Sequence, residues 1–200
     1  MSKPKRKQSK PREMKKIFLI FCEGQTEECY VQVLRSKYRV PIKIVARVEG
    51  LNISSKEITS HCKSLRIGVD DDNVKVFLMY DMDVPLDKSK FKGCCVEYLL
   101  TNPTFELWLL LHVANQSAAI STTDVIEKLK SFEEWANYKK GTFTEQQKNI
   151  LWDQKDEAIN RAKLLTDEEN PSSQIYKLLS LLDKANQRVL PTTHFLEVPG

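Results

Sequence analysis

The fold is decided by the stretch Ile17-Phe18-Leu19-Ile20-Phe21-Cys22, which is followed at once by Glu23-Gly24. Six consecutive apolar residues, rich in β-branched and aromatic types, are typical of a parallel strand that is buried on both faces. The acid and the glycine that follow end the strand. A second such strand, Val74–Tyr80, is followed by Asp81-Met82-Asp83. The sequence therefore predicts two buried strands with acidic residues at their carboxyl ends.

Strand and helix patterns alternate through the first half of the chain. Further strands are expected at 41–48 and 94–100, and helices at 26–38 (capped by Thr26), 54–66 and 105–113. Alternation of this kind predicts βαβ units with right-handed crossovers, and hence an α/β fold with a parallel sheet of about four strands flanked by helices. In such sheets ligands bind outside the carboxyl ends of the strands, where both acidic motifs fall.

Three segments are expected along the chain. Residues 17–113 form the α/β core, and residues 114–200 form a helical C-terminal region packed on it, with helices at 123–138, 144–168 and 172–186. Residues 1–16 hold eight Lys and Arg against Glu13, a charge of +7, which leaves −3 of the net +4 for the rest of the chain. This segment is expected to be a disordered basic arm that either binds phosphates of DNA or RNA or only aids solubility.

Composition excludes several classes of protein. Hydrophobic residues make up 41% and charged residues 29%, as in an ordinary folded domain. No apolar run approaches the roughly 20 residues of a membrane-spanning helix, and no apolar stretch of a secretory signal follows the basic N-terminus. The five cysteines lack CxxC spacing, which favours reduced thiols over disulfides or zinc. We expect a cytoplasmic protein with no membrane partner.

The acidic motifs predict a divalent metal site. Asp81 and Asp83 are two residues apart at a strand end, so both side chains point to one side. Clustered carboxylates repel one another unless a cation or a proton relieves the repulsion, and oxygen ligands suit Mg²⁺ or Mn²⁺. Glu23 is expected to be a third ligand or a general acid/base, and Gly24 leaves room for a phosphate group. Alone, an Asp-x-Asp motif is equally typical of a solvated loop.

Glu106 stands in the nearly all-apolar segment 105–113. A buried carboxylate must be paired, protonated or bound to a metal. Glu106 is therefore a candidate ligand of a second metal or a candidate for orienting the first ligands. Glu27, in the first turn of the helix expected after Glu23, is a further candidate for the same roles. The alternative for Glu106 is a structural acid at a helix start, facing backbone amides or a basic side chain. Asn102 is expected to be a turn residue, and His112 a helix-terminal histidine.

The chain resembles the RloB-like family. The resemblance covers about Ile17 to Leu182 and is carried by Phe21-Cys-Glu-Gly-Gln-Thr-Glu27 with Tyr30, Asp81-Met-Asp83, Asn102-Pro-Thr-Phe-Glu-Leu-Trp-Leu-Leu-Leu-His112, and Asn170-Pro171-Ser172 with Tyr176. That family includes an abortive-infection component of phage resistance and is similar to the Toprim fold. In Toprim proteins a strand-end glutamate, here Glu23, and an Asp-x-Asp pair, here Asp81 and Asp83, serve magnesium-dependent cleavage or nucleotidyl transfer.

The resemblance implies a function and a partner. We expect a Mg²⁺- or Mn²⁺-dependent nuclease that binds DNA or RNA and acts in antiviral defence beside an AAA- or ABC-like ATPase, with homo-oligomers as a further expectation. The alternative is a non-catalytic subunit in which the site binds a metal or nucleotide and regulates the ATPase. Where that family carries a lysine or arginine in the glycine turn, this chain has Gln25. A cation that could neutralise a scissile phosphate is therefore missing from that position.

Overall fold

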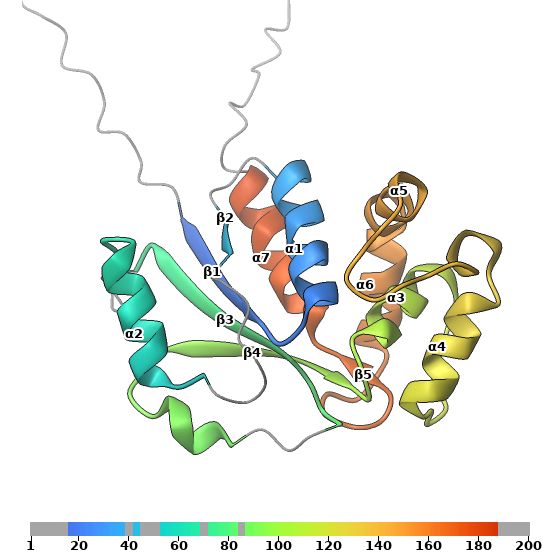
Figure 1. Cartoon of the computed structure of the whole chain (residues 1–200), viewed down its shortest axis with the longest axis horizontal. Coiled ribbons are helices and arrows are strands. Elements are labelled where there is room, and N and C mark those ends of the chain that lie inside the picture. The colour runs from blue at the N-terminus through green and yellow to red at the C-terminus, as the bar shows by residue number, and fades with distance from the viewer. Residues whose placement is uncertain (1–15, 39–41, 45–52, 69–71, 84–86, 188–200) are drawn as a thin grey trace, which may run out of the picture.

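The computed structural model describes residues 16–38, 42–44, 53–68, 72–83 and 87–187. Their five strands form one sheet in the order β2-β1-β3-β4-β5 (Figure 1). The strands are β1 (Ile17–Cys22), β2 (Ile42–Ile44), β3 (Val74–Asp81), β4 (Val96–Asn102) and β5 (Ser172–Ser173). The first four are parallel, and β5 pairs antiparallel to β4. The predicted α/β fold with about four parallel strands, flanking helices and a C-terminal helical extension is confirmed, with β5 added at one edge.

Two hydrophobic clusters cover the two faces of the sheet. Helix α2 (Ser55–Ser64) lies on one face, and α1 (Gln25–Lys37) and α7 (Ile175–Gln187) lie on the other (Figure 1). Residues alternate along β1 as the strand period requires: Leu19 and Phe21 join the α2 side, whereas Phe18 and Ile20 join the other. This burial on both faces explains why the strand reads as an unbroken apolar run.

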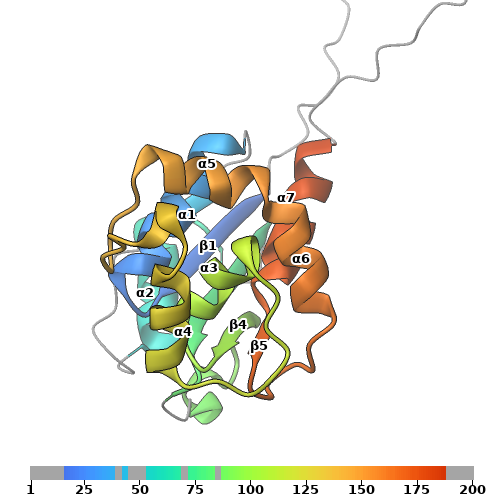
Figure 2. The ribbon, with the colours of Figure 1, turned by 90° about the vertical axis from the view of Figure 1, so that its right-hand side faces the viewer.

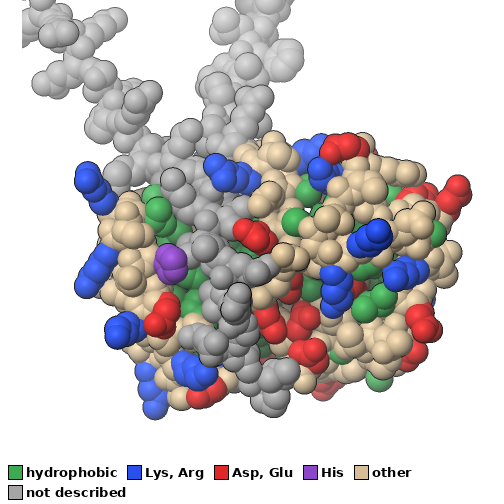
Figure 3. Space-filling view, viewed as in Figure 1, with side chains coloured by type: hydrophobic (Ala, Val, Ile, Leu, Met, Phe, Trp, Pro, Cys, Tyr) green, Lys and Arg blue, Asp and Glu red, His purple; other side chains and the backbone are tan. Residues whose placement is uncertain are grey.

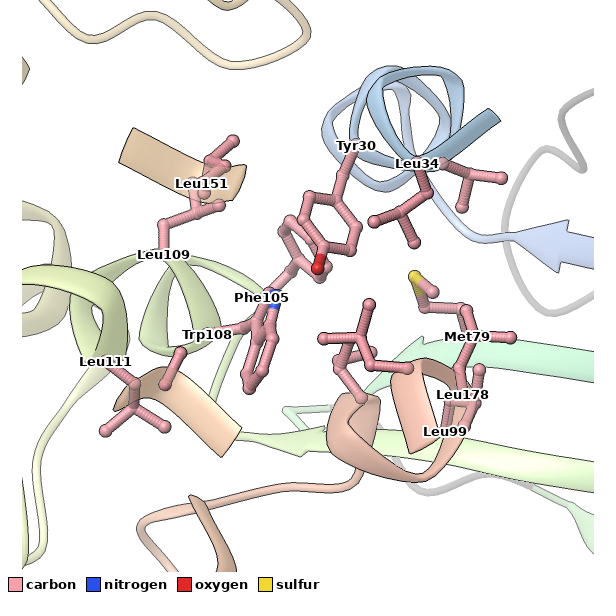
Figure 4. Close-up of a cluster of buried hydrophobic side chains, with 14 of the residues drawn as sticks. Tyr30, Leu34, Met79, Leu99, Phe105, Trp108, Leu109, Leu111, Leu151 and Leu178 are labelled. Carbon is pink, nitrogen blue, oxygen red and sulfur yellow. The ribbon is translucent and has the colours of Figure 1, made fainter. Parts of the chain in front are cut away.

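The helical region after the fourth strand is built around α3 (Glu106–Val113). Seven of its eight residues are buried. Figure 2 shows α3 surrounded by α4 (Thr122–Lys130), α5 (Glu145–Asp153) and α6 (Lys155–Lys163). In Figure 4 the Trp108 side chain points toward Tyr30 of α1, and the ring centroids of the two residues are 6.3 Å apart. One continuous cluster therefore joins the sheet, α1 and the C-terminal helices.

Three predicted helices differ from the structure. The helix expected at 123–138 ends at Lys130, because Phe132 is extended and a 3-10 turn, η3 (Glu133–Trp135), then buries Trp135. The helix expected at 144–168 is two helices, α5 and α6, which meet at Gln154. The helix expected at 172–186 begins at Ile175, because Ser172 and Ser173 extend the sheet by pairing with Asn102 and Thr101. Tertiary packing overrides helical periodicity at all three places.

Other boundaries moved less. β4 starts two residues later than expected, because the Cys94 amide donates to the Phe91 carbonyl at the end of a second 3-10 turn, η2 (Lys88–Phe91). At its other end β4 continues through Asn102. The first fifteen residues of the predicted arm, and most of the strand predicted at 41–48, lie outside the described residues. None of the described helices combines the length and the apolar character that a membrane crossing requires.

Candidate functional site

Glu23 follows the end of β1, Asp81 ends β3, and a hydrogen bond joins the two residues. The two strands pair in parallel with Cys22 beside Met79, so their ends meet. The Glu23 amide donates to the Met79 carbonyl at 3.1 Å, and the Asp81 amide donates to Glu23 Oε2 at 3.1 Å. The Glu23 side chain is therefore fixed across the strand ends, and burial raises the pKa of its carboxyl above the ordinary value. The predicted meeting of the acidic motifs at one sheet edge is what the fold produces.

A cavity of about 540 Å³ opens beside these strand ends. Figure 3 shows acidic side chains gathered near the middle of the face over them. The cavity is lined by Glu23, Gly24, Gln25, Thr26, Glu27, Asp81, Asp83, Phe105, Glu106 and Lys140. All six residues predicted from the sequence as candidates (Glu23, Gly24, Glu27, Asp81, Asp83, Glu106) are among them. Their role as metal ligands, acid/base or phosphate contact stays a prediction.

Glu27 is a buried acid in the first turn of α1. Its side chain is folded back on the glycine turn: a β-carbon at Gly24 would lie 2.9 Å from Glu27 Oε2. Burial, followed by repulsion from Glu106 and Glu23, raises the pKa of Glu27 to about 7, although a backbone hydrogen bond opposes the rise. Glycine at position 24 thus makes room for a carboxylate of the same chain. Helix α1 begins one residue before the predicted cap Thr26, whose hydroxyl accepts a hydrogen bond from the Gly141 amide instead.

Thr104 connects two further acids. Its hydroxyl lies 2.9 Å from Asp81 Oδ2 and 2.7 Å from Glu106 Oε2. A hydroxyl has one hydrogen, so it can donate to only one carboxylate at a time; both contacts are favourable only if one carboxyl carries a proton. Burial, followed by repulsion from Glu27, raises the pKa of Asp81 to about 8, while the Thr104 hydrogen bond opposes the rise. The cavity thus favours a proton, or a metal cation in its place.

Glu106 is almost completely buried, at 1% exposure. Its Oε1 accepts a hydrogen bond from the Tyr138 hydroxyl at 2.9 Å and lies 3.3 Å from Lys140 Nζ. Both partners come from the segment between α4 and α5. Glu106 is therefore a paired acid at the start of a helix, as the structural interpretation expects, and it also lines the cavity. Its role toward a metal stays a prediction.

The strongest indication of a cation site is at Asp81 Oδ1. This atom is buried and, within the described part of the chain, has no hydrogen-bond partner. A buried carboxylate oxygen without a donor is unfavourable, and a divalent cation is the kind of group that would satisfy it. However, no three His, Cys, Asp or Glu side chains of the described residues stand close enough together to hold one ion. The donor chemistry fits Mg²⁺ or Mn²⁺, but the side chains would have to draw closer around it.

Two residues considered from the sequence have structural contacts. Asn102 is the last residue of β4 and not a turn residue as expected, and its side-chain amide donates to the Glu168 carbonyl at 3.1 Å. The His112 Nδ1 lies 2.8 Å from the Trp108 carbonyl oxygen, and burial lowers the pKa of the imidazole to about 4. His112 is thus a neutral core residue and lies outside the cavity lining.

Sequence reasoning missed Thr104, Tyr138 and Lys140. Thr104 lies two residues before Glu106 in the motif Asn102–His112. That short spacing could have suggested that Thr104 contacts Glu106 and the acids near it. Tyr138 is the last residue of the helix predicted at 123–138, and Lys140 lies two residues beyond it. No pattern there links the two residues to the strand ends. Only the packing of the helical region on α1 and α3 brings them to the cavity.

A family model described as RloB-like protein matches residues 18–182. The match spans most of the chain, and the chain belongs to the RloB-like family. No curated protein and no solved structure matches it.

Proposed function

We propose that this chain is a Mg²⁺- or Mn²⁺-dependent nuclease component of a phage-defence system and that it acts with an ATPase partner. The observation that carries the proposal is the acidic cavity at the strand ends, where Asp81 Oδ1 is buried without a donor. Defence and the ATPase come from the resemblance to the RloB-like family, and the cleavage chemistry comes from its likeness to the Toprim fold.

Burial of several carboxylates in one cavity is unfavourable in the absence of a counter-charge. The acids come from three separate elements, namely the end of β1 with the start of α1, the end of β3, and the start of α3. Their convergence is a property of the whole fold and not of one local motif. A divalent cation would offset the cost of burial and the mutual repulsion, which together raise the pKa of Asp81 and of Glu27.

Each acid has a distinct part in this proposal. Asp81 and Asp83 would hold the cation, and the exposed Asp83 would do so from the open side of the cavity. Glu23 is held by the Asp81 amide through one oxygen, and its raised pKa suits it to accept or return a proton. When bound, the metal would polarise a phosphoryl oxygen and lower the pKa of an attacking water.

The second candidate function is a regulatory subunit that binds a metal or nucleotide without catalysis. It is favoured by one observation: in the described residues no three acidic side chains are already placed around a single ion. Catalytic groups usually need to be held close to their working geometry. A site that closes only when a ligand binds suits a sensor of the ATPase.

The test is paired cleavage and ATP hydrolysis by the complex with its ATPase, for the wild type and for Glu23→Gln. DNA and RNA substrates are offered with Mg²⁺ and with Mn²⁺. The nuclease proposal predicts that the wild type cuts and that Glu23→Gln loses about 10²-fold or more in rate, as expected when a catalytic electrostatic group is removed. Glu28→Gln is the matched control, because Glu28 lies five residues after Glu23, in the first turn of α1, but outside the cavity lining.

Two results would separate the candidates. If the wild-type complex never cuts either nucleic acid in either metal, and Glu23→Gln changes ATP turnover, the regulatory function replaces the nuclease. If Glu23→Gln and Glu28→Gln cut equally well, Glu23 has no part in catalysis.

A further inference from the structure

Lys140 is the one cation among the residues that line the described cavity. It reaches the cavity from the turn between η3 and α5, and its side chain is 60% exposed, whereas its partner Glu106 is 1% exposed. The ammonium group therefore stands on the solvent side of a buried carboxylate. An anionic substrate that approached this acidic cavity would meet repulsion everywhere except at this group.

The turn that carries Lys140 is fastened to the N-terminal part of α1. The Gly141 amide donates to Thr26 Oγ1 at 3.0 Å, and Cys29 Sγ donates to the Gly141 carbonyl at 2.9 Å. Gly141 has a φ of +77°, and a β-carbon there would lie 2.9 Å from both Cβ and Oε1 of Gln25. Glycine is thus required at 141 by backbone conformation and by close approach. The backbone next to Lys140 is held in place even though the side chain is exposed.

Gln25 has a packing role in this arrangement. It stands in the glycine turn, at the position where the family resemblance predicts a cation. Gly141 packs closely against its side chain. Lys140 precedes Gly141 in the chain, so the contact of Gly141 with Gln25 also brings Lys140 close to the glycine turn. Gln25 and Lys140 both line the same cavity.

The ion pair with Glu106 leaves Lys140 able to change partner. Glu106 already accepts a hydrogen bond from Tyr138 and lies 2.7 Å from the Thr104 hydroxyl, so Lys140 is not its sole partner. Because the Lys140 side chain is 60% exposed, solvent screens its attraction to Glu106. A lysine on a flexible four-carbon stem can then move a short way to a phosphate oxygen that enters the cavity.

We propose that Lys140 binds a phosphate oxygen of the substrate, and that the Gly141 contact with Gln25 and Thr26 places it for that purpose. The substrate class is a phosphodiester of a nucleic acid chain. This inference rests on the proposed function for the identity of the substrate. The phosphate contact itself can be measured without any cleavage.

The experiment measures binding of a fluorescent single-stranded oligonucleotide to the full chain in Mg²⁺ at several salt concentrations. All proteins carry Glu23→Gln so that no cleavage occurs. Lys140→Ala is compared with Lys140→Arg, which keeps the charge, and with Lys139→Ala, the matched control from the same turn outside the cavity lining. Lys140→Ala should weaken binding about tenfold or more, the size of one charge-assisted hydrogen bond.

The salt dependence separates a phosphate contact from a structural role. Loss of one phosphate contact should lower the slope of log K against log salt by about 0.7 for a single strand. Lys140→Arg should retain most of the affinity and the slope. Lys140→Ala with the affinity and slope of Lys139→Ala overturns the inference, as does weaker binding with an unchanged slope, because Lys140 would then only neutralise Glu106. Absence of cleavage by the wild type would count against the nuclease alone, since this binding assay does not depend on it.

Discussion

The buried side chains of α3 lie in two neighbourhoods, one apolar and one acidic, in which burial has opposite effects on the free energy. Trp108 and the leucines of the helix lie in the apolar cluster of Figure 4, where burial itself is favourable. Glu106, in the first turn, faces a cavity in which burial, followed by repulsion from neighbouring carboxylates, raises the pKa of Asp81 and of Glu27. The apolar neighbourhood needs no ligand, whereas the acidic one is unfavourable without a cation or protons. Both neighbourhoods contact the same short helix. The acidic neighbourhood does not add to stability, so we attribute it to function.

The largest effect is expected in the apolar neighbourhood. Trp108→Ala removes a fully buried ring and should lower the free energy of unfolding by about 3–5 kcal/mol. Urea unfolding followed by circular dichroism measures this change. Trp152→Ala is the control, because Trp152 is half-buried and packs against Tyr38 at the edge of the same cluster. Equal losses for the two variants would contradict the account of the core.

The acidic neighbourhood should show itself in the pH dependence of stability. Burial raises the pKa of Asp81 to about 8 and that of Glu27 to about 7, so the folded state holds protons that the unfolded state releases near pH 4. The free energy of unfolding should therefore fall as pH rises from about 4 to 8, because the folded state binds more protons there. Melting temperatures in EDTA at pH 5.5, 7 and 8.5 measure the fall.

Asp81→Asn tests which group causes this fall in stability. It removes the carboxyl with the larger of the two rises in pKa. The variant should lose stability less steeply than the wild type over the same pH range. A wild type whose melting temperature rises between pH 5.5 and 8.5, or an identical slope in Asp81→Asn, would show that Asp81 is not a strained buried acid.

The smallest effect is expected where a leucine is exposed. Leu164 is 82% exposed at the end of α6, so Leu164→Ser should change the free energy of unfolding by less than about 0.5 kcal/mol. Leu109→Ala, in the buried part of α3, should cost about 2–5 kcal/mol in the same urea experiment. A large loss for Leu164→Ser would mean that this leucine is covered in solution.

The parts of the fold that sequence predicts well are those with a local cause. The apolar run of β1 and the acids after β1 and β3 follow from strand period and parallel topology alone. The break between α5 and α6 and the switch to β5 could not be predicted, because they depend on which residues meet across the helical region. Ser172 and Ser173 look like a helix start until their pairing with β4 is known.

The candidate site divides in the same way. Glu23, Asp81 and Asp83 were found from the sequence because they stand at strand ends, and Glu106 was found because it stands on an apolar helix. Glu27 was found in the motif that begins around Glu23. Lys140 and Tyr138 reach the cavity only through tertiary contacts, such as that between Gly141 and Thr26. Their residue types carry no signal that would distinguish them from surface lysines and core tyrosines elsewhere in the chain.

If the acidic cavity binds a divalent cation, Mn²⁺ should raise the melting temperature of the wild type at pH 8. At Mn²⁺ about 100-fold above Kd, binding to the folded state should add about 2.7 kcal/mol to the wild type. Asp153→Asn, an exposed control outside the cavity lining, should gain as much. Asp81→Asn should match or exceed the wild type in EDTA and gain nothing from Mn²⁺. An equal Mn²⁺ gain in Asp81→Asn and in the wild type, or no gain in either, would contradict the account.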